Sequence, residues 1–205
     1  MNRSFAQFIS AVFHPLLMPS FSVVLLFQVN SYLTFTLPTE MKWLIMGLVF
    51  MNTFIFPTLF VVLLVKRKYI QSIFLDVQKE RLLPFVLAFF FYSFTYYLLR
   101  RANLPPVLNS LMLGAAVSVI VSLGLNFISK ISIHMVGIAG VIGAFSAIAL
   151  LLNINILFLL IVLSIITGIV GTSRISMQKH TNFQLLIGAL VGFFSEFLVV
   201  YYRLG

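Results

Sequence analysis

The chain has 205 residues, of which 61% are hydrophobic and only 8% are charged. A soluble domain carries about 25% charged residues, so this composition excludes a water-soluble globular protein and predicts one whose solvent is lipid. The absence of cysteine excludes disulfides and thiolate metal sites. The net charge of +9 would suggest nucleic acid on a soluble protein, but these cations lie between apolar runs. There they favour lipid headgroups or a phosphorylated ligand as partner, and not nucleic acid.

The apolar runs predict an all-α fold: an integral membrane helical bundle of six or seven transmembrane helices in one domain, residues 1–205. A helix needs about 20 apolar residues to cross a bilayer. The first run contains Pro15 and Pro19, which break or kink a helix, so it is expected either to span or to lie at the interface. Asn153 and Asn155 predict a tight turn between the fifth and sixth runs. The seven runs are 8–29, 43–65, 82–99, 107–128, 135–152, 156–170 and 184–202.

Three polar segments, residues 66–81, 129–134 and 171–183, carry most of the chemistry. Two spans separate each segment from the next, so all three are predicted to emerge on the same side of the membrane. They bring together His134, His180 and several cations. Arginine can bind phosphate oxygens through two hydrogen bonds, and histidine can act as a nucleophile or a general acid near neutral pH. The pattern therefore favours phosphate chemistry at the membrane surface.

The last polar segment contains Ser173-Arg174, then five residues, then His180, followed by Gln184 and Gly188. This spacing resembles the third signature of the type-2 phosphatidic acid phosphatase superfamily, in which an aspartate stands at the position of Gln184. Order and predicted sidedness also agree with that family, and the resemblance extends over roughly residues 76 to 192, Asp76 included.

The other two segments resemble the first two signatures of the same family more loosely. Ser132-Ile133-His134 is similar to the second signature, Pro-Ser-Gly-His, with isoleucine in place of glycine. Lys79 and Arg81, followed by Pro84, are similar to the first, Lys-x6-Arg-Pro, although the spacing differs.

The resemblance implies a membrane lipid phosphatase that uses neither metal nor cofactor. His180 would attack phosphorus to form a phosphohistidine, and His134 would protonate the leaving alcohol. Its substrate would be a lipid phosphomonoester or pyrophosphate. The protein would lie among membrane lipids in the inner membrane of a bacterium, with the site on either side of that membrane. The residues implied to hold the phosphoryl oxygens are Arg174, Ser173, Ser132, Lys79 and Arg81.

Gln184 permits two interpretations. It could orient His180 through its carbonyl oxygen, or it could form a capping box with Thr181, three residues earlier. An amide has no charge to stabilise an imidazolium, so a catalytically inactive homologue that binds or transports a lipid phosphate is the alternative function. A third hypothesis is a scaffold subunit of a membrane complex, but it would not explain why the three polar segments lie on the same side of the membrane. Histidines that face each other across a phosphate-sized gap would favour the enzyme, and a channel through both leaflets would favour the transporter.

Two further polar residues lie within apolar runs. His14 could belong to the site, or it could satisfy broken backbone beside Pro15. Glu196 is an ionisable residue at membrane depth. We expect it to form a structural ion pair with Arg100 or Arg101; the alternative is a role in the passage of an ion or a substrate. A stripe of small residues in the fifth run predicts close helix packing: Gly137, Gly140, Gly143 and Ala147.

Overall fold

A computed structural model describes residues 1–29, 37–72 and 77–205, and all regular structure in these residues is helical. Within these residues, seven helical stretches are long and apolar enough to cross a membrane, so the chain is an integral membrane protein with a helical-bundle fold. This confirms the predicted fold class with the larger of the two span counts. The elements are α1 (Arg3–Val12), η1 (Pro15–Leu17), α2 (Met18–Gln28), α4 (Thr39–Phe50), η2 (Met51–Ile55), α5 (Phe56–Lys66), η3 (Lys79–Arg81), α6 (Leu82–Arg101), α7 (Pro106–Asn126), α8 (Ile133–Leu152), α9 (Leu157–Ser176) and α10 (Asn182–Leu204).

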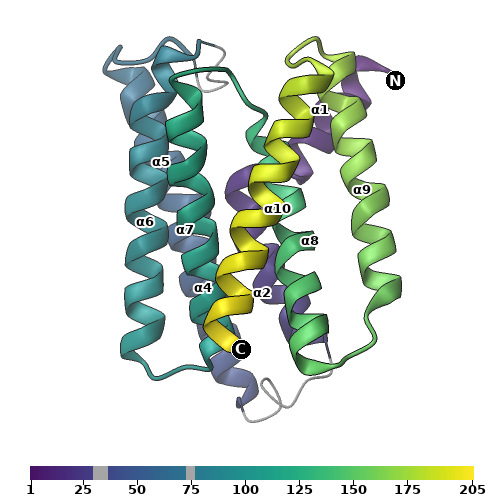
Figure 1. Ribbon diagram of the computed structural model, residues 1–205. Helices are drawn as coiled ribbons and strands as arrows, with labels where there is room; N and C mark the ends of the chain where they lie inside the picture. The colour runs from purple at the N-terminus through teal and green to yellow at the C-terminus, as the bar shows by residue number, and fades with distance from the viewer. Residues whose placement is uncertain (30–36, 73–76) are drawn as a thin grey trace.

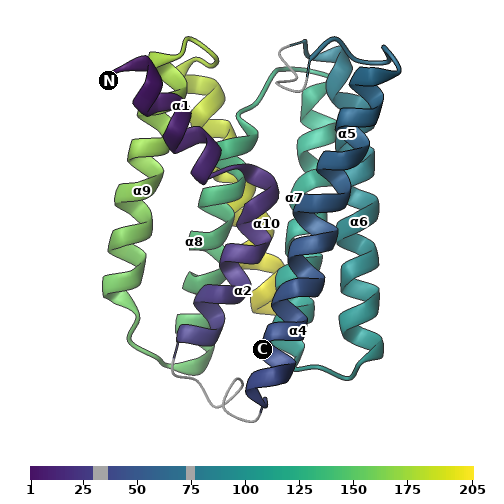
Figure 2. The same ribbon diagram turned by 180° about the vertical axis from the view of Figure 1, so that it is seen from behind.

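The first span is broken where the two prolines predict it. Helix α1 ends at Val12, and His14 precedes a single 3-10 turn that begins with Pro15. The backbone N–H of Leu16 donates to Nδ1 of His14 at 3.3 Å, so the side chain caps the interrupted backbone. Helix α1 lies beside α9 at one end of the bundle, and α2 continues toward the other end (Figure 2).

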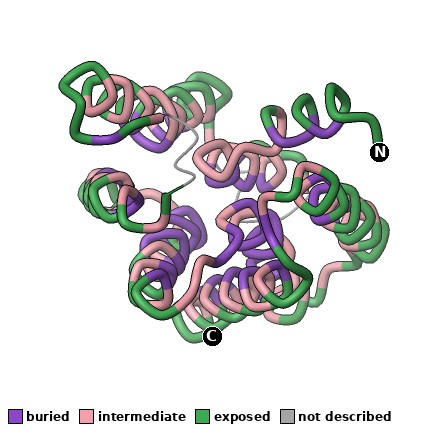
Figure 3. The backbone as a smooth tube through the Cα atoms, turned by 90° about the horizontal axis from the view of Figure 1, so that it is seen from above, coloured by how far each residue is buried: buried purple, intermediate pink, exposed green. Residues whose placement is uncertain are grey.

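The bundle has two groups of helices, one of α4 to α7 and one of α1, α2, α8 and α9, with α10 packed against both α7 and α8 (Figure 1). Helices α7 and α8 are the most buried spans. Seen from above, buried residues face the middle of the bundle and exposed residues face outward (Figure 3). The outward side chains are large and apolar, such as Phe158 and Trp43, as lipid contact requires.

Glycines allow α8 and α10 to approach closely. A Cβ atom at Gly192 would collide with the carbonyl oxygen of Val136, and one at Gly143 with that of Phe193. A Cβ at Gly188 would lie 2.7 Å from the carbonyl oxygen of Ser132. The predicted packing role of the small residues in α8 is thus confirmed, and α10 supplies glycines of its own.

The three polar segments lie at the same end of the bundle, as the parity of the spans predicts (Figure 1). The segment between α7 and α8 descends into the bundle before α8 begins, so the start of α8 is recessed. Two hydrogen bonds hold this segment: Nη1 of Arg81 donates to the carbonyl of Ile131 at 3.1 Å, and the N–H of Ser132 donates to the carbonyl of Gln184 at 3.3 Å. These contacts tie the segment between α7 and α8 to the first polar segment and to the first turn of α10.

Candidate active site

A cavity of about 860 Å³ lies between the two groups of helices at the end that carries the polar segments. Apolar side chains from η2, α5 and α6 form one wall, and α2, α7 and α8 form much of the rest. Among the described residues, three histidines and four cationic side chains line it: His14, His134, His180, Arg3, Arg81, Arg174 and Lys179. A cavity of this size accommodates a ligand considerably larger than a phosphate group.

His180 is held by a turn between α9 and α10. The turn reverses through Gln178, whose φ of 54° is left-handed, and it ends at Thr181, the N-cap of α10. Nδ1 of His180 lies 3.2 Å from Oε1 of Gln184, an oxygen that also accepts from the N–H of Thr181 at 3.3 Å. Oγ1 of Thr181 in turn accepts from the N–H of Gln184. The predicted capping box is therefore present, and the same side-chain oxygen of Gln184 also contacts His180.

The contact with Gln184 assigns the tautomer of His180. An amide oxygen only accepts, so Nδ1 carries the hydrogen and Nε2 keeps its lone pair for a ligand. Burial and the charge of Arg174 lower the pKa of His180 to about 4, against a smaller opposing contribution from the hydrogen bond to Gln184. The side chain is therefore neutral at pH 7, which is the form that can act as a nucleophile.

His134 lies in the recessed first turn of α8. Its Nε2 donates to the carbonyl oxygen of Ser10 at 3.1 Å, so in the neutral ring Nδ1 is the basic nitrogen. Nδ1 is buried and has no hydrogen-bond partner among the described residues. The carbonyl group that fixes His134 comes from Ser10 in α1. The sequence pattern did not connect this helix with the site.

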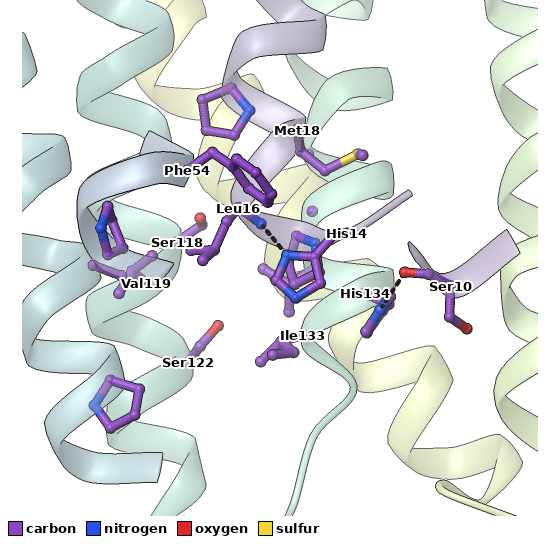
Figure 4. Close-up of a pocket in the computed structure, with 18 of the residues that line it drawn as sticks. Ser10, His14, Leu16, Met18, Phe54, Ser118, Val119, Ser122, Ile133 and His134 are labelled. Atoms are coloured by element: carbon purple, nitrogen blue, oxygen red, sulfur yellow. Dashed lines mark hydrogen bonds between the residues drawn. The ribbon is translucent and has the colours of Figure 1, made fainter. Parts of the chain in front are cut away.

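His14 lies beside His134 (Figure 4). The two ring centroids are 5.8 Å apart and the rings are nearly perpendicular, at 78°. Because Nδ1 of His14 accepts from Leu16, Nε2 carries the hydrogen and is a donor. Phe54 packs against the other side of the ring, 6.2 Å away. His14 thus both satisfies the broken backbone and lines the cavity, so its two predicted roles coexist.

Arg174 is the central cation. It lies in the last turn of α9, not in a loop as predicted, because α9 continues to Ser176. Nη1 donates to Oγ of Ser10 at 3.3 Å, and its charge acts on all three imidazoles. A guanidinium in this position can bind the oxygens of an anion that sits among the histidines.

Not every residue predicted as catalytic or phosphate-binding reaches the cavity. His134, His180, Arg81 and Arg174 line it, whereas Lys79 is exposed and does not. The other two predicted ligands are fully buried behind the wall. Oγ of Ser173 donates to the carbonyl of Val170 at 2.7 Å, and Oγ of Ser132 has no partner among the described residues. Asp76 falls outside the residues that the structure describes.

The ion pair predicted for Glu196 is wrong. Arg100 and Arg101 donate instead to the hydroxyls of Tyr96 and Tyr97, one turn earlier in α6. Glu196 faces the interior of the bundle and lines the inner part of the cavity. The sequence distance from Gln184 gave its depth, but not the face of α10 on which it lies.

In chemical terms, the cavity combines a neutral imidazole with a free Nε2, a second imidazole with a free Nδ1, and converging positive charge. This arrangement suits attack on phosphorus with proton transfer to the leaving group. Comparison of the chain with protein-family models, curated proteins and solved structures finds no match. Its function must therefore be inferred from the cavity itself.

Proposed function

We propose that the protein is a membrane lipid phosphatase that hydrolyses a lipid phosphomonoester or pyrophosphate through a phosphohistidine at His180. The observation that carries the proposal is the hydrogen bond from Nδ1 of His180 to Gln184, which leaves Nε2 unprotonated beside Arg174 in a cavity that also contains His134. In this proposal the chain is a divergent member of the type-2 phosphatidic acid phosphatase superfamily in the inner membrane of a bacterium.

The proposed reaction has two steps. Nε2 of His180 attacks phosphorus, the bond to the leaving oxygen breaks, and the proton of a singly protonated phosphate passes through Nδ1 of His134 to that oxygen. His134 then takes a proton from water at the same nitrogen, and the hydroxide releases phosphate from His180. Arg174 and Arg81 stabilise the negative charge on the phosphoryl oxygens in both steps.

The position of the cavity supports a lipid as substrate. The charged residues lie at the membrane-surface end, while the wall from η2, α5 and α6 is apolar, with Phe54, Val62 and Phe85 among its residues. An amphiphile could place its phosphate among the histidines and its chains along this wall. Phosphatidic acid, phosphatidylglycerol phosphate, a polyprenyl pyrophosphate and a phosphorylated lipid A all have this form.

One observation favours the second candidate, a protein that binds or transports a lipid phosphate without cleaving it. Gln184 contributes an amide, so His180 lacks a carboxylate that would stabilise its imidazolium form. Against transport, a second cavity of about 650 Å³ at the opposite end shares no lining residue with the first among the described residues. We therefore place hydrolysis first.

The test is phosphate release from a panel of lipid phosphates in detergent, with and without EDTA. We expect turnover that EDTA does not remove and that the His180→Ala variant loses. Lys66→Ala is the matched control, because Lys66 is an exposed residue at the same end of the bundle and does not line the cavity. Folded protein that releases phosphate from no lipid of the panel would refute hydrolysis and favour binding or transport.

A further inference from the structure

We infer that the inner end of the cavity is a second polar site, which selects lipid phosphates carrying hydroxyl or amide N–H groups near the phosphate. The inference deepens the proposed function and rests on it. It assigns a substrate class, such as phosphorylated N-acyl amino alcohols or phosphorylated saccharolipids, in preference to simple diacylglycerol phosphates.

Glu196 is the main evidence. Its side chain lines the cavity, yet it is only 9% exposed. Oε2 has no hydrogen-bond partner among the described residues. A buried polar group without a partner is costly and rare in a folded protein, and more so in a membrane. A ligand that donates hydrogen bonds would supply the missing partner.

The surrounding backbone is shaped to admit this carboxyl group. A Cβ atom at Gly114 of α7 would collide with Oε2 of Glu196, and one at Gly140 of α8 would lie 3.1 Å from its Cγ. Two glycines on two helices thus provide the volume that the side chain occupies. An acidic residue that merely pointed toward lipid would need no such space.

Further polar groups continue from Glu196 toward the histidines. Gly114, Ser118 and Ser122 are spaced by four residues, so they share one face of α7, and both serines line the cavity opposite His14 (Figure 4). Oγ of Ser122 has no partner among the described residues, and Oγ of Ser118 bonds only to its own helix, at the carbonyl of Ala115. The inner end therefore offers acceptor oxygens that no described residue satisfies.

The distance between the two sites suits one ligand. Gly140, which contacts Glu196, follows His134 by six residues in α8, or about 9 Å along the helix. A phosphate among the histidines would place the first few bonds of the lipid backbone in this interval. A diacylglycerol phosphate presents only ester oxygens there, which cannot donate. An N-acyl amino alcohol phosphate presents a hydroxyl and an amide N–H.

The experiment compares the binding of two lipids with equal chain lengths, dioctanoyl phosphatidic acid and a ceramide 1-phosphate. Native mass spectrometry of the His180→Ala protein in detergent measures affinity without turnover. We expect the ceramide phosphate to bind about tenfold more tightly, as one or two hydrogen bonds would give. The Glu196→Met variant, similar in volume but without acceptors, should bring this ratio to about one. Leu198→Met, an exposed position on the same helix, is the control and should leave it unchanged.

Equal binding of the two lipids by the parent protein, or a preference that survives Glu196→Met, would overturn the inference. If that variant does not fold, Ser122→Ala replaces it, and the ratio should then fall by about threefold. The two proposals fail separately. Preferential binding with turnover of no lipid in the panel would refute hydrolysis alone, whereas turnover with equal binding of the two lipids would refute the inner site alone.

Discussion

Replacing Gln184 by glutamate tests how the protein controls His180. Glutamate has the length of glutamine, so a carboxylate oxygen would replace Oε1 at 3.2 Å from Nδ1 of His180. The capping box with Thr181 would persist, because glutamate is a preferred partner at that position. The substitution therefore changes the charge beside the histidine and leaves the local fold intact.

The electrostatic effect can be worked from the geometry. Two unit charges about 4 Å apart attract by about 4 kcal/mol at an effective dielectric constant of about 20, and measured pKa shifts from a neighbouring carboxylate are about 1–3 units. The pKa of His180, held at about 4 by burial and Arg174, should rise to roughly 5–7 in Gln184→Glu. A more basic imidazole is a better nucleophile, and the new carboxylate would stabilise the positive charge that His180 acquires when it bonds to phosphorus. Turnover at pH 7 should therefore increase by about tenfold.

NMR titration of ¹⁵N-histidine-labelled protein in micelles checks this prediction, with His180→Gln to assign the resonance. The control is Gln184→Met, which retains the length but removes the acceptor that raises the pKa of His180, and which should therefore lower that pKa further. If the His180 resonance titrates at the same pH in wild type and Gln184→Glu, then Gln184 does not contact Nδ1 and the assigned tautomer is wrong.

Two more predictions concern packing and charge. Gly192→Ala should lower the stability of the α8–α10 pair by about 1–3 kcal/mol, because the added Cβ would collide with the backbone of α8. Gly168→Ala is the control, because a Cβ there would meet no other atom. Melting temperatures in detergent should fall for the first variant and not for the second. Arg174→Gln should raise the pKa of His180, since that charge lowers it. The acid limb of the pH profile of kcat/KM should move to higher pH, and phosphate should bind more weakly. An acid limb that does not move would contradict the role of Arg174 in lowering the pKa of His180.

The sequence predicted much of the fold because membrane spans are set by length and hydropathy alone. The parity of the spans placed the three polar segments at one end, and the proline pair located the break before α2. The span ends were less accurate. The sixth span was expected to stop at residue 170, but α9 continues to Ser176. Ser173 and Arg174 consequently lie in a helix.

Part of the candidate site was also available from the sequence. The spacing of Arg174, His180 and Gln184 is local, so their relation depends on a single turn and one capping box, and the structure brings Arg174 and His180 to the cavity as expected. His134 joins them because the same-side argument holds. Lys79, Ser132 and Ser173 were chosen by motif alone, and no local rule reports whether a side chain faces the cavity or lies behind its wall.

By itself, then, the sequence determined that lipid surrounds the protein, where the apolar spans lie and which end of the bundle the polar segments share; it left six or seven spans and two roles of Gln184 open. Only the tertiary structure decided which distant residues complete the cavity. Ser10 accepts from His134, which lies 124 positions away in the chain, and His14 packs on the same ring across the break in the first span. Glu196 turned inward rather than toward Arg100, because glycines on α7 and α8 leave room for it there. Hydropathy cannot encode such choices, since they depend on the packing of helices that lie far apart in sequence.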